Sequence, residues 1–285
     1  MTSHPSPSDE PVQPPQRPPR EPFQRWRLVL ARSAVEPDQA QRSQQEAWEA
    51  ALVRSGLPVA GMDGPRGRPR FASAAPLAAA IPGEGELVDV WLIERLPRWR
   101  VREALARVLP LGHTLVDVQD VWLGEAPLPG RVSASVYCTV LGPGVDADAV
   151  RAVADALCAT TSLPRERRKG ESMVAYDLRP FVEAIEVTDA ADSEAFGSRP
   201  GAGPGSGAAI LRMTLRHDPE KGVGRPEELL AALEERAGFP LKAHGLVRER
   251  LVLADRANPV EPPRTRGPRP RPGAENPRPV RGPRR

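Results

Sequence analysis

The sequence predicts an α+β protein made of two ferredoxin-like halves in tandem, and three observations lead to this fold class. Segments with alternating apolar residues, which are typical of strands, follow segments in which apolar residues recur at helical spacing. The order strand, helix, strand, strand, helix, strand occurs twice along the chain, and this order is typical of ferredoxin-like domains. A short Gly/Pro-rich stretch at 124–130 separates the repeats, so we expect halves at 23–124 and 130–255.

The first half begins with a strand in which Trp26, Leu28 and Leu30 alternate onto one face. Gly56 lies where a glycine ends a helix, and Pro110 stops the second helix. In chain order we expect a strand at 25–31, a helix between 37 and 56, a short strand at 57–60, an extended stretch at 71–81, a strand at 86–93, a helix between 97 and 110, and a strand at 113–123.

The second half repeats this order. Pro226 marks a helix start, because Glu227 and Glu228 in the first turn suit the helix dipole, and Gly238 ends that helix. In chain order we expect a strand at 133–141, a helix at 146–159, strands at 173–178, 181–187 and 208–215, a helix between 226 and 238, and a strand at 243–254.

Proline and arginine collect at the two ends of the chain, which has 285 residues and 35 prolines. Residues 1–22 hold eight prolines, and residues 256–285 hold nine prolines and nine arginines, with a net charge of +7. Segments with so little apolar surface cannot offset the entropy of ordering, so we expect both ends to be disordered. Residues 23–255 have a net charge of −3, so the positive balance of the chain comes from the tail.

A glycine-rich stretch at 189–207 interrupts the second half. It lacks the Gly-Lys-Ser/Thr end of a phosphate-binding loop. We therefore expect a flexible surface loop there.

Several functional classes are excluded by what the sequence lacks. No stretch has the roughly 18 consecutive apolar residues of a membrane span, and the polar N-terminus is unlike a secretory signal. Cys138 and Cys158 are too few for a disulfide framework or a four-ligand zinc site, and none of the four histidines has a second histidine three or four residues away. We expect a cytoplasmic protein without membrane partner, metal or cofactor, and the sequence assigns no catalytic residue.

Two clusters of basic residues are the candidate phosphate-binding sites. In the first, at 64–70, Arg66, Arg68 and Arg70 lie among glycines that let the backbone approach a ligand, and the forked donors of arginine suit phosphate. The second cluster comprises Arg165, Arg167, Arg168 and Lys169, followed by Arg179. Such runs are also typical of solvated turns, and the sequence leaves open whether the two clusters share one face.

Six stretches carry a family resemblance. They are RSGLPVA at 54–60, GRPRFASAAPL at 67–77, EGELVDV at 84–90, RERRKG at 165–170, YDLRP at 176–180 and GRPEEL at 224–229. In this order they resemble the bacterial radical SAM-associated (radical-SAM-linked) protein family, a domain of unknown function. The resemblance covers roughly 24–254.

The resemblance implies an accessory role in RNA or ribosome-related modification and names no substrate. Members of the family are stand-alone chains or C-terminal parts of radical SAM proteins. The chain departs from the family at two motifs: the Ser-His-Leu-Asp motif is replaced by DQAQRSQQ at 38–45, and the Ser-Gln-Gly-Phe-Asn-Pro loop by GMDGPR at 61–66. Radical SAM chemistry needs three cysteines around its cluster, so a chain with two cysteines is not itself the radical SAM enzyme. If it works in that chemistry, the cluster is on a separate radical SAM polypeptide.

These observations favour a non-catalytic module that binds RNA or a ribonucleoprotein and docks it to a partner, with the arginine clusters and the tail as phosphate contacts. The first alternative is an enzyme with a site in the cleft between the halves, formed by Asp63, Asp89, Asp177 and Arg179. The second is a protein–protein adaptor that uses the free faces of the sheets.

Overall fold

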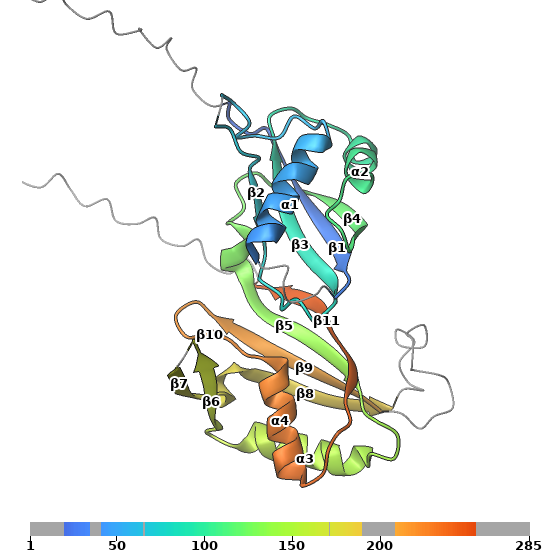
Figure 1. Ribbon diagram of the computed structural model, residues 1–285, viewed down its shortest axis with the longest axis vertical. Helices are drawn as coiled ribbons and strands as arrows, with labels where there is room; N and C mark the ends of the chain where they lie inside the picture. The colour runs from blue at the N-terminus through green and yellow to red at the C-terminus, as the bar shows by residue number, and fades with distance from the viewer. Residues whose placement is uncertain (1–19, 35–40, 65, 171, 190–208, 255–285) are drawn as a thin grey trace, which may run out of the picture. The chain divides into compact units, whose positions relative to one another are not determined.

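The computed structural model describes residues 20–34, 41–64, 66–170, 172–189 and 209–254. Within these ranges, four α-helices and a large mixed sheet confirm the predicted α+β class (Figure 1). The predictions for 1–19, 190–207 and 256–285 lie outside the described residues.

The N-terminal half is built around its first strand. Its elements are β1 (Gln24–Arg32), α1 (Gln41–Arg54), β2 (Phe71–Ser73), β3 (Gly83–Leu92), α2 (Arg98–Ala106) and β4 (His113–Val121). β1 pairs antiparallel with both β3 and β4, and β2 pairs antiparallel with β3. The resulting strand order is β4-β1-β3-β2.

The C-terminal half has the same plan. Its elements are η1 (Leu128–Arg131), β5 (Val132–Val140), α3 (Ala147–Ala159), β6 (Pro164–Lys169), β7 (Ser172–Asp177), η2 (Arg179–Phe181), β8 (Val182–Asp189), β9 (Ala209–Asp218), β10 (Gly222–Val223), α4 (Pro226–Ala237) and β11 (His244–Leu253). β5 pairs antiparallel with β9 and β11, and β8 pairs with β9, so the order β11-β5-β9-β8 matches that of the N-terminal half.

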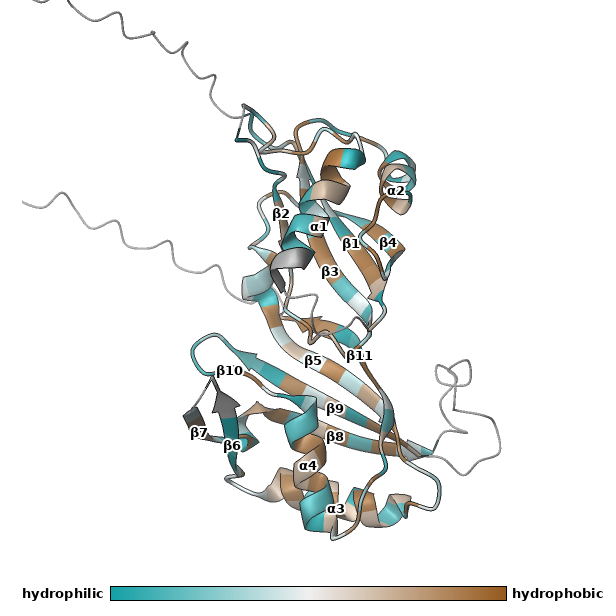
Figure 2. Cartoon of the chain, viewed as in Figure 1, coloured by the Kyte–Doolittle hydropathy of each residue, from teal (hydrophilic) through white to brown (hydrophobic). Residues whose placement is uncertain are grey.

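Each half has its own apolar core between sheet and helices. The N-terminal core joins the sheet to α1 and α2, and the C-terminal core joins it to α3 and α4. Figure 2 shows apolar residues along β1 and β3 next to α1. Fully buried members are Leu28, Leu52 and Leu105 in the first core and Leu157, Leu211 and Leu233 in the second.

Local signals in the sequence set the helix ends. Asp146 precedes α3, and its Oδ1 accepts hydrogen bonds from the N–H groups of Asp148 and Ala149 at 3.0 and 3.1 Å, which satisfies two otherwise unpaired donors of the first turn. Gly238 ends α4 with φ 75°, a conformation that glycine adopts without steric cost.

The halves meet at the start of β3 and at the segment 74–82 that precedes it. β3 and β11 pair in parallel at Gly83 and Arg248, and Ile81 packs into the C-terminal core. Two buried arginines, Arg32 of β1 and Arg248, donate to carbonyl groups of this segment. The acceptors are Leu77, Ala78 and Ile81 for Arg32, and Ala75 and Pro76 for Arg248.

The basic stretch after α3 differs from the prediction. The sequence predicts a connection at 165–169, whereas these residues form β6 and pair antiparallel with β7 in a separate hairpin. Consecutive charged residues have a low strand propensity, but cross-strand partners stabilise the strand, and Arg167 stacks over Tyr176 at 5.0 Å. The predicted short strand at 57–60 is reduced to one bridge, between Val59 and Leu92.

Candidate nucleic-acid interface

The arginine loop, residues 61–70, is fixed to the end of β3. The Arg70 N–H donates to the Ala60 carbonyl at 2.7 Å, and the Trp91 N–H donates to the Arg70 carbonyl at 3.2 Å. Gly61 has φ +87°, and a Cβ at this position would lie 2.5 Å from a backbone oxygen of the loop. The tight turn at this position therefore requires glycine.

The three predicted arginines of this loop are exposed. Arg68 has its Nη1 3.8 Å from Glu49 Oε1, a weak surface pairing that leaves most of the side chain in solvent. The guanidinium carbon of Arg70 lies 4.8 Å from the centroid of the Trp91 ring, a contact that orients the side chain. Arg66, Arg68 and Arg70 thus present exposed forked donors that suit phosphate groups, and Trp91 orients the one of Arg70.

A buried ion-pair network lies next to Trp91. Arg25 also stacks on the Trp91 ring, at 4.8 Å, and its Nε donates to Asp89 Oδ2 at 2.9 Å. Arg27 donates from its Nε to Asp89 Oδ1 at 2.9 Å and from Nη2 to Glu125 at 3.3 Å. Asp89 is 0% exposed, so its carboxylate cannot reach a substrate. It holds Arg27 and also Arg25, the arginine that stacks on Trp91.

Two other acids from the enzyme hypothesis accept hydrogen bonds from backbone N–H groups. Asp63 accepts a hydrogen bond from the Arg20 N–H at 3.0 Å. Asp177, at the end of β7, accepts hydrogen bonds from the N–H groups of Leu163 and Arg179 at 2.7 and 2.9 Å. These bonds, foremost the one from Leu163, hold the pKa of Asp177 below its ordinary value.

The second basic cluster faces α4. Arg165 pairs with Glu235 at 2.5 Å, and Arg167 lies over Tyr176. Burial raises the pKa of Glu228 on α4, and the charges of Arg167 and Arg165 oppose that rise. Two members of the cluster thus interact with side chains of their own half, whereas the arginine loop points to solvent from the other half.

The remaining predicted phosphate-binding residues have different surroundings. Arg179 donates to the carbonyl groups of Cys158, Thr160 and Val182 at 2.5, 2.9 and 2.7 Å, which closes the C-terminal end of α3. The side chains of Arg168 and Lys169 lie outside the described part of the structure.

Two exposed tryptophans were not identified from the sequence. Trp99 on α2 is 66% exposed, and Trp122, just after β4, is 69% exposed. A signal for Trp99 exists, because Val101 and Leu105 form the buried side of α2. At 100° per residue, Trp99 lies about 200° around the helix from Val101 and so projects away from the core.

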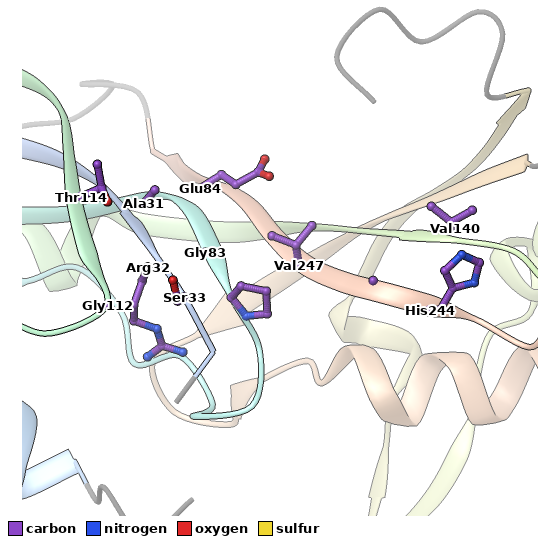
Figure 3. Close-up of a pocket in the computed structure, with 12 residues that line it drawn as sticks. Ala31, Arg32, Ser33, Gly83, Glu84, Gly112, Thr114, Val140, His244 and Val247 are labelled. Carbon is purple, nitrogen blue, oxygen red and sulfur yellow. The ribbon is translucent and has the colours of Figure 1, made fainter. Parts of the chain in front are cut away.

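A cavity of about 440 Å³ opens where the halves meet (Figure 3). The ends of β1, β3 and β4 line one side, and β5 and β11 line the other. Its polar side chains are Arg32, Ser33, Glu84, Thr114 and His244, and its apolar ones include Val140 and Val247. These residues come from five strands, and no sequence spacing connects them.

The polar side chains of the cavity do not converge on one point. Figure 3 shows the Arg32 guanidinium directed away from Glu84, with His244 beyond Val247. The acids of the enzyme hypothesis are absent from the lining. Among the described residues, no three His, Cys, Asp or Glu side chains are grouped to hold a metal ion. The volume suits a small ligand, but a catalytic arrangement is not present in this lining.

His217 of β9 gives the C-terminal half an acid-sensitive site. Burial, together with the nearby charge of Arg248, lowers the pKa of His217 to about 4, and its Nε2 lies 2.8 Å from the Ser135 hydroxyl. Below about pH 6.5 this histidine binds a proton in the unfolded chain but stays neutral in the folded protein. The stability of the folded protein therefore falls as the pH decreases toward 4.

We expect His217→Gln to lose part of this pH dependence. Between pH 6.5 and 5 the wild type should lose about 1 kcal/mol more than the variant, after a discount for solvent screening. Urea unfolding at the two pH values measures the difference. Equal losses in both proteins would show that His217 does not carry the effect.

The comparisons with known proteins place most of these features in one conserved region. A sequence profile described as "Uncharacterized protein conserved in bacteria (DUF2344)" matches residues 40–221, more than half of the chain. The match includes the arginine loop, α2 and the β6–β7 hairpin. No curated protein matches the chain. In the described ranges, no helix is long and apolar enough to cross a membrane.

Proposed function

Because the chain belongs to the DUF2344 family of bacterial proteins, whose description assigns no activity, we propose its function from the geometry of the arginine loop. The protein is a non-catalytic accessory module that binds RNA or a ribonucleoprotein. The observation that carries this proposal is the set of exposed arginines, Arg66, Arg68 and Arg70, on a loop held against β3. Backbone hydrogen bonds at Arg70 anchor the loop to β3, and arginines on an anchored backbone bind phosphates at a lower entropic cost than arginines on a mobile chain.

The module presents its RNA in the cytoplasm to a radical SAM protein on a separate chain. The resemblance to radical SAM-associated proteins supports this partner, and the two cysteines require the cluster to be elsewhere. The repeated strand order supports two ferredoxin-like halves, at 23–124 and 130–255. Arg165, Arg167, Arg168, Lys169 and Arg179, together with the tail at 256–285, are proposed as secondary phosphate contacts.

The loop is tested by the double variant Arg66→Ala/Arg68→Ala. We expect RNA binding to weaken about 10-fold near 0.1 M salt, and the slope of log affinity against log salt to fall by about 1.4, because two phosphate contacts are lost. Anisotropy of a labelled RNA at several salt concentrations measures both quantities. The full chain and a chain without 256–285 are compared, so that the tail contribution is separated from that of the loop.

A matched control removes two exposed arginines elsewhere. Arg225→Ala/Arg236→Ala takes the same charge from the two ends of α4 and should change the affinity less than twofold. If deletion of 256–285 abolishes binding, or if the control weakens it as much as the loop variant, the arginine loop is not the RNA site.

One observation favours a second function. The 440 Å³ cavity between the halves has the size of a small-ligand site, with a lining different from the residues of the enzyme hypothesis. A Glu84→Gln variant with full RNA binding but without binding of a small metabolite that the wild type binds would favour this second function. Retention of RNA binding by the variant, without a loss of metabolite binding, would not favour this second function.

A further inference from the structure

Three large aromatic side chains are exposed in the N-terminal half. Phe23, Trp99 and Trp122 are 66%, 66% and 69% exposed. The other tryptophans of the chain, Trp26, Trp48 and Trp91, are buried. Exposed tryptophan is unusual in a folded domain, and a group of exposed large apolar side chains is typical of a binding surface.

The fold brings these aromatic residues to the same end of the sheet. Gln24, the first residue of β1, accepts a hydrogen bond from the Leu96 N–H at 2.9 Å and donates to Asp120 at 3.2 Å. Trp99 lies three residues after Leu96 and Trp122 two residues after Asp120. α2 and β4 therefore meet at the start of β1 (Figure 1), where Phe23 precedes the strand.

Positive charge surrounds Trp99. Arginines flank it on both sides, and the turn and helix at 94–107 carry five arginines against two glutamates. Arg98 is paired with Asp117 on β4, and Arg102 donates to the Val116 carbonyl at 3.2 Å, which fixes α2 against the edge of the sheet. Arg95 and Arg100 are exposed beside the tryptophan.

The arginine loop lies at the same end of β3. Ala60 N–H donates to the Trp91 carbonyl at 2.8 Å, and Ile93 N–H donates to the Pro58 carbonyl at 2.9 Å. The residues between Ile93 and α2 then lead directly to Trp99. The end of β3 thus connects a set of phosphate-binding groups with a set of exposed aromatic rings.

We propose that the aromatic surface, formed by Trp99 and Trp122 with Arg95 and Arg100, stacks on unpaired bases, so that the RNA bound at this end is single-stranded. This inference rests on the proposed function and names its substrate class. Aromatic rings stack on the faces of bases, which are accessible in single strands and covered in a duplex. The flanking arginines favour a polyanion over an apolar protein face.

The test compares two RNAs in the full chain: an oligouridine of about twelve nucleotides and a duplex of about twelve base pairs. We expect Trp99→Ala/Trp122→Ala to weaken binding of the oligouridine about 10-fold or more and to leave duplex binding unchanged. Trp99→Phe/Trp122→Phe should retain most of the affinity, because phenylalanine also stacks. Leu111→Ala, which removes an 86% exposed apolar side chain just before β4, is the control and should change neither.

The two proposals fail in different ways. If the wild type binds neither RNA, the proposed function is wrong, and the proposal of an aromatic stacking surface is wrong as well. If Arg66→Ala/Arg68→Ala weakens binding but the tryptophan variant binds both RNAs like the wild type, RNA binding stands and the stacking surface is wrong. Equal losses of affinity for the oligouridine and the duplex would also overturn the stacking proposal, because a duplex has no unpaired bases whose stacking the variant could remove. Circular dichroism checks that the variants fold.

Discussion

Asp89→Asn is expected to destabilise the protein by about 3–5 kcal/mol, because removal of one partner of a buried ion pair leaves the other charge uncompensated. Asp89 faces two arginines of β1, Arg25 and Arg27, that are 1% and 7% exposed. Its two oxygens accept four hydrogen bonds from them, at 2.5 to 3.1 Å. Asparagine keeps the shape but removes the negative charge that both guanidinium groups require.

Urea unfolding followed by tryptophan fluorescence measures this loss. The matched control is Asp117→Asn on β4, which removes the partner of Arg98 from an ion pair whose side chains are 33% and 60% exposed. Exposed pairs contribute about 0–1 kcal/mol, so the control should lose less than 1 kcal/mol. A similar small loss for Asp89→Asn would mean that water or rearrangement compensates the two arginines.

The order of elements was predictable because it depends on local patterns. Alternation in Trp26, Leu28 and Leu30 defines β1, and the residues before and after the helices carry capping signals such as Asp146 and Gly238. These patterns act within a few residues. The α+β class therefore follows from the sequence, with most element positions correct.

The β6–β7 hairpin was not fully predictable for the opposite reason. The residues of β6 have no apolar alternation, and the strand depends on pairing with β7 and on contacts with α4. Those contacts join residues as far apart as Arg165 and Glu235. A pattern read along the chain does not contain them.

The candidate site shows the same division. The exposed arginines of the loop could be selected from the sequence because arginine alternates there with glycine or proline. The surroundings of Asp89 and Arg179 could not be predicted from the sequence. Asp89 is buried between two arginines and Arg179 closes a helix end, and both environments depend on contacts between distant residues. The exposure of Trp99 was predictable in principle, because Val101 and Leu105 define the buried side of α2 and Trp99 lies on the opposite side.

The second large effect is expected at the junction of the halves. Arg248 of β11 is 1% exposed and donates from Nε to Glu86 Oε1 of β3 at 2.8 Å and from Nη2 to Glu86 Oε2. Its Nη1 and Nη2 also donate to the carbonyl groups of Pro76 and Ala75. Glu86→Gln removes the counter-charge of a buried cation that reaches from one half into the other. We expect it to lower stability by about 3 kcal/mol and to uncouple the unfolding of the halves.

The positions of the tryptophans make this uncoupling measurable. All five lie between residues 26 and 122, in the N-terminal half, so their fluorescence reports on that half alone, whereas far-ultraviolet circular dichroism reports on both. In the wild type the two urea transitions should coincide. In Glu86→Gln they should separate, because Arg248 no longer stabilises the contact of β11 with β3 and 74–82.

The control Glu183→Gln, which breaks an exposed pair with Arg216, should keep the two transitions together. Coincident transitions in Glu86→Gln would show that the apolar contacts of Ile81 suffice to couple the halves.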